Sequence, residues 1–161
     1  MVGEPQGSHQ LVPKVAAIYE WIDTRCRQEP ARAGRCKGCG ACCDFVAYDH
    51  RLYVTPPELA YLAAKLGVRE LKTMPTGRCP YQEGPKCTVH EQRFAGCRIF
   101  GCDGDPDFQS ELSEETLRRL KALCEESRVP YRYQDLAAAL AGVNCDTCRS
   151  AAAPGPADRE G

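Results

Sequence analysis

Four cysteines occupy eight consecutive positions, in the sequence Cys36-Lys-Gly-Cys39-Gly-Ala-Cys42-Cys43. Two cysteines separated by two residues let their thiolates converge on one metal ion or cluster, as in zinc ribbons and ferredoxin-type sequences. Disulfide bonds suit this run poorly, because bridging cysteines so close in sequence strains the geometry of the bond. The spacing therefore predicts that this segment coordinates a metal.

A second group of four cysteines lies downstream, at Cys79, Cys87, Cys97 and Cys102. The combined pattern is C-x2-C-x2-C-C, then a C-P pair, a C-x7-C step and a closing C-R-x-F-x-C. This pattern resembles that of the YkgJ-type cysteine-cluster family, which is described as a zinc- or iron-chelating domain. The resemblance covers about residues 36–102 and implies that eight cysteines are metal ligands: Cys36, Cys39, Cys42, Cys43, Cys79, Cys87, Cys97 and Cys102.

Two positions depart from the family pattern. Arg93 is followed by Phe94, where the family usually has proline, and Gly101 stands before the last cysteine, where proline is also common. Neither change removes a thiolate, so both concern local geometry rather than the ability to bind metal.

The identity of the metal stays open at this point. A closed zinc site takes four thiolates at Zn–S distances of ~2.3 Å, so two such sites would use all of these cysteines. A [4Fe–4S] cluster also takes four, and Cys36, Cys39 and Cys42 have the spacing of three ligands to one cluster, with Cys43 directed elsewhere. This run gives a slight preference for iron–sulfur, and the division of the ligands between sites is not determined.

Three further residues stand beside the second group of cysteines. His90 follows Cys87 by three positions, but with enough thiolates available we interpret it as a solvent-exposed loop residue rather than a ligand. Arg93 and Arg98 have two equally weighted interpretations. They either pair with the negative charge of a thiolate-bound metal or are ordinary surface arginines.

A third C-x2-C pair, Cys145 and Cys148, lies outside the family pattern. One interpretation is a second metal site shared with Cys124 and Cys26, and another is a redox pair. A glycine break before the pair and the polar sequence after it do not match a redox motif, so we favour an auxiliary or accidental pair.

Composition excludes several classes of protein. The formal net charge is −1 with a pI near 6.3, and the basic residues are scattered, which argues against nucleic-acid binding. No stretch approaches the roughly 18 apolar residues of a membrane span, and the first ten residues lack the pattern of a secretory signal. We therefore expect a cytoplasmic protein, whose reducing compartment favours metal binding over disulfides.

The first predicted helix covers residues 11–28, where apolar residues recur at helical spacing. Pro13 is expected in its first turn, and Pro30 and Gly34 are expected to end the pattern. Cys26 falls on the apolar stripe, where we interpret it as a small buried hydrophobe.

A second helix is predicted after Thr55, because a threonine N-cap, Pro56 at the first helical position and Glu58 three residues after the cap form a capping box. Its apolar face reaches Leu66, and Gly67 is the expected C-cap.

Two more helices are predicted in the C-terminal half of the chain. Ser113 is taken as the N-cap of one helix that continues until Pro130 stops it. Asp135 is expected to begin a short helix over residues 136–141, which Gly142 ends.

The remaining segments carry little helical signal. Residues 45–54 are predicted to form two short strands, and residues 74–108 a long loop that metal ligation holds in place. We therefore expect a mainly α single small domain over residues 11–149, with a Cys-rich, loop-rich, metal-stapled centre and at most a small β-hairpin. Residues 1–10 are expected to be flexible, and residues 150–161 a disordered tail.

The leading hypothesis for function is a metal-chelating protein that binds zinc or an iron–sulfur cluster, in a structural or electron-transfer role, with a protein partner. The alternative, suggested by related flagellin lysine methylases, is an iron–sulfur-dependent enzyme that acts on a protein substrate. A cofactor pocket bordered by Tyr81, Phe94 and Phe100 would support this alternative. The sequence leaves open whether the protein is an enzyme, and it does not reveal the oligomeric state.

Overall fold

The structure, a computed structural model, describes residues 6–33, 52–68, 70–74, 78–83, 86–100 and 104–142. Most of these residues are helical, and the strands are only two residues long. The prediction of a mainly α single small domain with very little β-structure is confirmed. None of the described helices is both long and apolar enough to cross a membrane.

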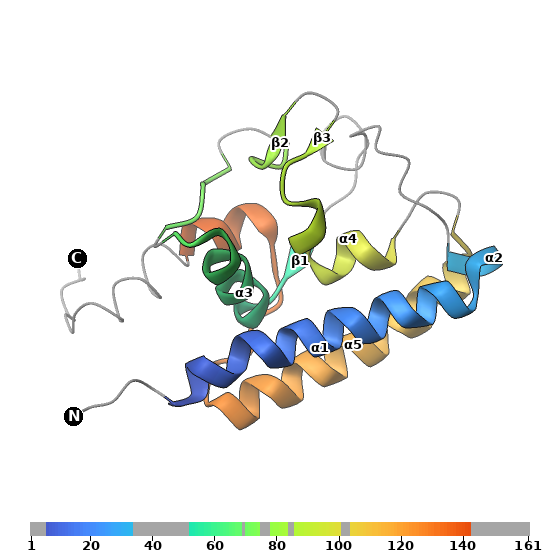
Figure 1. The fold of residues 1–161 in the computed structure, drawn as a ribbon, viewed down its shortest axis with the longest axis horizontal. Coiled ribbons are helices and arrows are strands. Elements are labelled where there is room, and N and C mark those ends of the chain that lie inside the picture. Colours follow the sequence, from blue (N-terminus) through green and yellow to red (C-terminus); the bar gives the residue numbers. More distant parts are fainter. Residues whose placement is uncertain are drawn as a thin grey trace.

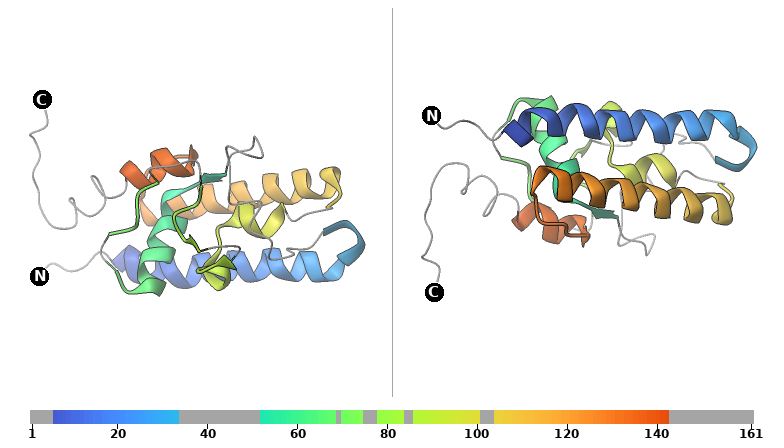
Figure 2. Two further views of the ribbon diagram at one scale, coloured as in Figure 1. Left: turned by 90° about the horizontal axis from the view of Figure 1, so that it is seen from above. Right: turned by 90° about the horizontal axis from the view of Figure 1, so that it is seen from below.

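Two long helices form the base of the molecule and lie side by side in antiparallel directions (Figures 1 and 2). They are α1 (Gln6–Gln28) and α5 (Pro106–Ser127). An ion pair near each end confirms the direction: Lys14 pairs with Glu126, and Arg32, in the short helix α2 (Pro30–Ala33), pairs with Asp105 at 2.8 Å. The pair is therefore joined at both ends.

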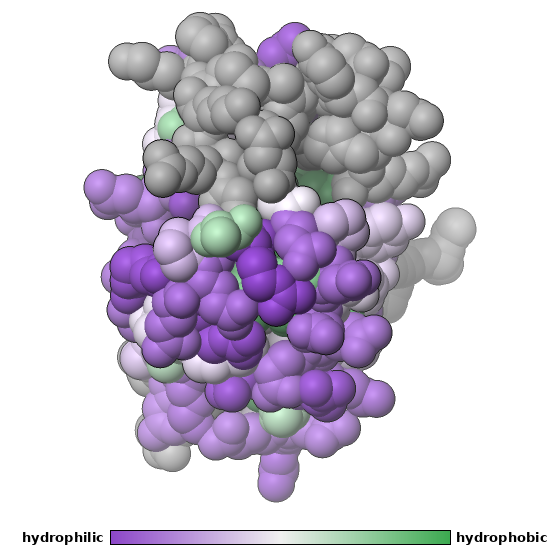
Figure 3. Space-filling model, turned by 90° about the vertical axis from the view of Figure 1, so that its right-hand side faces the viewer, coloured by the Kyte–Doolittle hydropathy of each residue, from purple (hydrophilic) through white to green (hydrophobic). Residues whose placement is uncertain are grey.

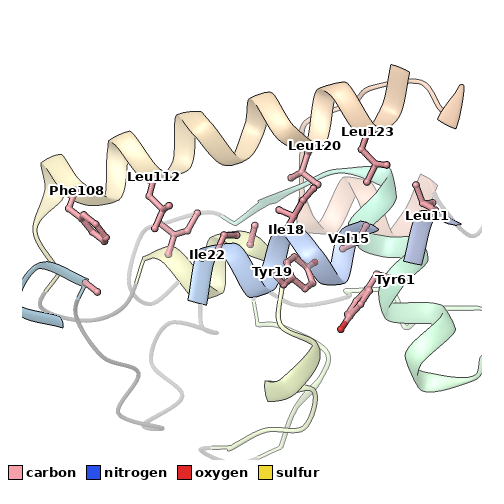
Figure 4. Close-up of a cluster of buried hydrophobic side chains, with 13 residues drawn as sticks. Leu11, Val15, Ile18, Tyr19, Ile22, Tyr61, Phe108, Leu112, Leu120 and Leu123 are labelled. Atoms are coloured by element: carbon pink, nitrogen blue, oxygen red, sulfur yellow. The ribbon is translucent and has the colours of Figure 1, made fainter. Parts of the chain in front are cut away.

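Apolar side chains from both long helices fill the space between them (Figure 4). On α1 they recur every three or four residues, which places them on one face of the helix. The buried members of this first cluster are Leu11, Val15, Ile18, Tyr19, Ile22, Ala33, Tyr61, Ala95, Ile99, Phe108, Leu112, Leu120 and Leu123. Tyr61 comes from α3 (Pro56–Leu66), and its ring meets that of Tyr19 edge-on, with centroids 4.9 Å apart.

The start of α1 differs from the prediction. The helix begins at Gln6, so Pro13 lies in its interior rather than in its first turn. Proline in a helix interior removes one backbone hydrogen bond, and burial of Leu11 and Val15 against α5 holds the helix on both sides of it. Pro30 does not simply end the pattern: it opens α2, a position that proline favours.

Helix α3 has the predicted ends. The Thr55 backbone N–H and hydroxyl both donate to Oε2 of Glu58, at 3.0 and 2.9 Å. At the other end, Gly67 has a φ of 69°, the left-handed conformation that glycine adopts at a helix C-terminus. The capping box and the glycine C-cap are both confirmed.

Helix α5 begins eight residues before the position expected from the sequence. Its N-cap is Asp105, whose side chain accepts the N–H of Asp107, and Pro106 is the first helical residue. The prediction of Ser113 as the cap was wrong, because the acidic residues before it were interpreted as a loop. At the other end Arg128 adopts a left-handed conformation, with a φ of 60°, two residues before Pro130.

The strands pair in two small antiparallel sheets within the described residues. Strand β1 (Tyr53–Val54) pairs with β4 (Gln134–Asp135), far along the chain. The expected pairing within residues 45–54 falls partly outside the described residues, and the described part has this distant partner instead. After β4, the Asp135 side chain accepts the N–H of Ala138 at 2.9 Å, and the predicted short helix is present over residues 136–142, so that it includes Gly142 instead of ending before it.

The segment interpreted as a long loop, residues 74–108, contains four short elements. They are β2 (Gln82–Glu83), β3 (Lys86–Cys87), η2 (His90–Gln92) and α4 (Ala95–Ile99). They lie on one side of the long helices, together with α3 (Figure 1). Each is too short to show periodicity in a sequence, which is why the prediction missed them.

A second apolar cluster lies under these short elements. Its buried members are Val54, Leu59, Leu62, Leu71, Cys79, Tyr81, Val89, Phe94, Leu136, Ala139 and Leu140. At the end of the molecule near α2, by contrast with this buried cluster, the described residues on the surface are mainly hydrophilic (Figure 3). The short elements therefore pack on an apolar cluster of their own, which is distinct from the cluster between α1 and α5.

Candidate metal centre

Three of the eight cysteines predicted as ligands lie in the described part of the chain: Cys79, Cys87 and Cys97. The other five predicted ligands, and the Cys145 and Cys148 pair, lie outside the described residues. They are Cys36, Cys39, Cys42, Cys43 and Cys102. The structure therefore describes three of the four cysteines of the second group, and Cys102 lies outside the described residues.

Cys79 and Cys87 are held by the β2–β3 hairpin. The carbonyl of Cys79 accepts the N–H of Gln82 at 3.1 Å, which forms the turn into β2. Cys87, on β3, pairs with Gln82 across the hairpin. The turn and the strand pair thus share Gln82, and this residue fixes the backbone of both cysteines relative to each other.

Cys97 comes from a different element, in the first turn of α4. It is partly buried and packs against the second apolar cluster, as Cys87 does, while Cys79 is a buried member of that cluster. Two cysteines of the hairpin and one of α4 therefore border one apolar cluster. Apolar surroundings of this kind limit solvent access to a metal bound at their edge.

These three thiols suit a soft-metal site but do not complete one. No group of three or more His, Cys, Asp or Glu side chains within the described residues is arranged to hold a metal. No disulfide links any two of the five described cysteines. Thiolates select zinc and iron–sulfur clusters, so the donor chemistry of the three residues fits such a centre.

A family model matches residues 35–135, which is more than half of the chain. Its name is CxxCxxCC, and its description is "Putative zinc- or iron-chelating domain". The chain belongs to the CxxCxxCC family. This assignment supports metal binding and confirms the resemblance inferred from the cysteine pattern. No curated protein sequence and no solved structure matched the chain.

The CxxCxxCC match extends beyond the segment predicted as the family core. It continues past Cys102 through α5 and ends at Asp135, the last residue of β4. Since β4 pairs with β1, the matched segment includes both strands of that small sheet. All of α1 lies before the match, although α1 supplies much of the first apolar cluster.

The two arginines next to Cys97 hold the backbone of this segment. Arg93 donates to the carbonyls of His90 and Cys97, at 2.9 and 3.2 Å. Arg98 donates to the carbonyls of Arg93 and Glu91 and forms an ion pair with Asp23 of α1 at 2.8 Å. The Arg98 side chain is only 6% exposed, so its interpretation as a surface arginine was wrong. Pairing of either arginine with a thiolate stays a prediction.

His90 is exposed and lies in η2. Partial burial of its ring, followed by the charges of Arg93 and Arg98, lowers the pKa of His90. The predicted exposure of this residue is confirmed, but it lies in a 3-10 helix rather than a loop, and its exclusion as a ligand stays a prediction.

Cys26 and Cys124 lie at opposite ends of the long helix pair. Arg25 lies over the ring of Phe108, with its guanidinium carbon 5.8 Å from the ring centroid, so the end of α1 is beside the start of α5. Cys124 is sixteen residues after Phe108 in the same helix, which corresponds to about 24 Å along the helix axis. A metal site shared by Cys26 and Cys124 is therefore excluded by the geometry.

Both thiols serve packing instead. Cys26 is partly buried against the first apolar cluster, and burial raises its thiol pKa. Cys124 is 1% exposed, and burial, with smaller effects of Glu125 and Glu58, raises its pKa to about 11. Cys26 therefore packs against apolar residues as predicted, but it is partly rather than fully buried.

The aromatic residues considered for a cofactor pocket do not share one. Tyr81 and Phe94 are buried in the second apolar cluster, at 5% and 3% exposure, whereas Phe100 is 51% exposed. Phe100 instead borders a small hollow together with Tyr53 and Tyr133. Within the described residues, Tyr81, Phe94 and Phe100 therefore do not border a common cofactor pocket, which was the feature expected of an enzyme.

Proposed function

We propose that this CxxCxxCC protein binds zinc or an iron–sulfur cluster through the eight cysteines of its family pattern. The observation that carries the proposal is the arrangement of Cys79, Cys87 and Cys97. These residues come from a turn, a strand and a helix, yet all three border the same apolar cluster. The metal would hold these elements together, in a structural role or as a centre for electron transfer.

The weakness of the local secondary structure supports a structural contribution from the metal. The hairpin strands are two residues long, and α4 is five residues long. An isolated hairpin or a helix of this length is not stable in water. Cross-linking through a metal would convert binding free energy into folding free energy, in addition to the stability that these short elements gain from the second apolar cluster.

The closure of the chain around the cysteines also supports a common centre. The N–H of Asp105 donates to the carbonyl of Arg32 at 2.8 Å, so the chain returns after Cys102 to the point it left before Cys36. Cys36 follows Ala33 by three residues, a span of at most about 11 Å. The segment that leads to the first cysteine of the pattern and the segment that follows the last one are therefore joined by this hydrogen bond.

The spacing of the first group of cysteines is the basis for a preference between zinc and an iron–sulfur cluster. Two closed zinc sites would use four thiolates each, while the spacing of Cys36, Cys39 and Cys42 suits three ligands of one [4Fe–4S] cluster. We favour the cluster slightly. The proposal includes a reducing compartment, the cytoplasm, and a protein partner that exchanges electrons or metal with the centre.

Analysis of metal and acid-labile sulfide, with a visible spectrum of protein purified without oxygen, tests the proposal. Iron with sulfide and a brown colour would establish a cluster. One or two zinc ions per chain in colourless protein would establish a structural zinc centre. Protein that contains neither metal and acquires neither from solution would overturn the proposal.

A further inference from the structure

Glu58 is a carboxylate buried where three helices meet. Its residue is 1% exposed, and it lies in the first turn of α3. Burial raises the pKa of Glu58, against the effect of its hydrogen bonds from Ala95 and Thr55. A buried carboxylate is costly unless its oxygens are hydrogen-bonded, so the partners of this side chain show what it is used for.

The two oxygens of Glu58 serve different parts of the fold. Oε2 accepts from the N–H and hydroxyl of Thr55, which completes the capping box of α3. Oε1 accepts the N–H of Ala95 at 2.8 Å and the hydroxyl of Tyr19 at 3.4 Å. All four donors are neutral groups, and they belong to three separate segments of the chain. One carboxylate therefore joins α1, α3 and α4.

Helix α4 depends on this bond for its first turn. Its N-cap residue, Phe94, makes no side-chain hydrogen bond to the helix. The N–H groups of the first turn of a helix have no partner within the helix. Glu58 supplies the missing acceptor for Ala95 from a residue thirty-seven positions earlier in the sequence.

Cys97 lies two residues after Ala95, in the same turn of α4. We propose that Glu58 is a positioning residue of the metal centre, which fixes the first turn of α4 and thereby the thiol of Cys97. The inference rests on the proposed function, since it assigns Cys97 as a ligand. The capping box accounts for Oε2 of Glu58 but not for Oε1, and positioning of α4 is the role of that second oxygen.

The test uses Glu58→Gln, which keeps the shape of the side chain but replaces one accepting oxygen with an NH2 group. An NH2 group cannot accept, so one of the two pairs of donors loses its partner. The first readout needs no metal: the rate at which iodoacetamide modifies Cys97 in metal-free, reduced protein, with Cys124 as the internal reference. We expect modification of Cys97 to be about fivefold or more faster in the variant, because local opening sets such rates.

The second readout is the affinity for Zn²⁺, measured by competition with a chelator. Residues that orient metal ligands typically change affinity by 10–100-fold when mutated, so we expect a loss of about tenfold or more. Leu123→Ala is the matched control, because it weakens the cluster between α1 and α5 but leaves the hydrogen bond from Ala95 to Glu58 in place. Equal acceleration at Cys97 in this control, at equal loss of overall stability, would overturn the inference.

A measurement on the unaltered protein covers the case in which Glu58→Gln does not fold. The amide of Ala95 should exchange with solvent deuterium far more slowly than an unprotected amide, and exchange at the unprotected rate would overturn the inference. Failure of the proposed function looks different. In that case the unaltered protein binds neither zinc nor iron, while modification of Cys97 and exchange at Ala95 still report whether Glu58 holds α4.

Discussion

The guanidinium of Arg98 lies over the ring of Tyr19, with its central carbon 4.1 Å from the ring centroid. Its nitrogens also bind the carboxylate of Asp23 and the carbonyls of Arg93 and Glu91. This one side chain joins α1 to the segment that leads into α4. Helix α4 has only five residues, so these contacts of Arg98 hold it against α1 where its own packing surface is small.

Arg98→Lys should destabilise the protein by about 1–2 kcal/mol, since a lysine ammonium cannot reproduce the planar fork of donors and leaves partly buried partners without a donor. Urea unfolding measures the change. Arg119→Lys is the control, because Arg119 also stacks on an aromatic ring of α1, that of Trp21 at 3.9 Å, but its side chain is 43% exposed. A loss as large in the control as in Arg98→Lys would show that stacking, not buried hydrogen bonding, matters.

Cys124 should make stability depend on alkaline pH. Its pKa is raised in the folded protein from 9.0 to about 11, so its contribution is complete below pH 9 and is lost as the pH rises through 11. Two pKa units correspond to roughly 2–3 kcal/mol. Unfolding measured between pH 8 and 11 should therefore show a decline that is smaller in Cys124→Ala. Identical slopes in both proteins would contradict this expectation.

The Arg32–Asp105 pair should produce the opposite dependence at acid pH. The hydrogen bond from Arg32 lowers the pKa of Asp105 below its ordinary 3.8, so the pair stabilises the fold above that value and its contribution is lost as the pH falls through the lowered pKa. Asp105→Asn keeps an N-cap residue but removes the charge. The variant should be less stable at pH 6, with a difference that shrinks toward pH 3 and in high salt.

Arg32→Gln should remove the same pH dependence, and the double variant should lose little more than either single variant. Fully additive losses would mean that Arg32 and Asp105 act independently, and that their contact at 2.8 Å is not what stabilises this end of the helix pair.

Cys97→Ser should lose most of the bound metal and several kcal/mol of stability, because metal-binding free energy is folding free energy in a site of this kind. Cys26→Ser, at a thiol that packs against the first apolar cluster and donates to the carbonyl of Arg98, should keep the metal of the unaltered protein. Metal content by elemental analysis and urea unfolding compare the two. A Cys97→Ser protein with full metal content and unchanged stability would refute the ligand assignment.

What the sequence predicted well was local. The capping box of Thr55 and Glu58 and the C-cap at Gly67 depend on residues a few positions apart, and they were found where predicted. The pairing of Tyr53 with Asp135 could not be predicted in this way, since two-residue strands have no periodicity and the partner is distant. Tertiary structure alone brings them together.

The site shows the same division. The cysteine pattern predicted the family and named Cys79, Cys87 and Cys97, three residues that border one apolar cluster. The roles of Glu58 and Arg98 were missed in part, because a capping glutamate and an exposed arginine are the ordinary interpretations of such residues. Only the fold shows that the first also binds α4 and that the second is buried.

The contact between Arg32 and Asp105 joins the two ends of the segment that carries the cysteines. Every cysteine of the family pattern lies between these two residues, and the chain enters and leaves that stretch at one point. The stretch nevertheless contributes to the core, because Tyr61, Ala95 and Ile99 within it are buried in the cluster between α1 and α5. A deletion that removed α3 or α4 would therefore also take buried side chains away from the two long helices.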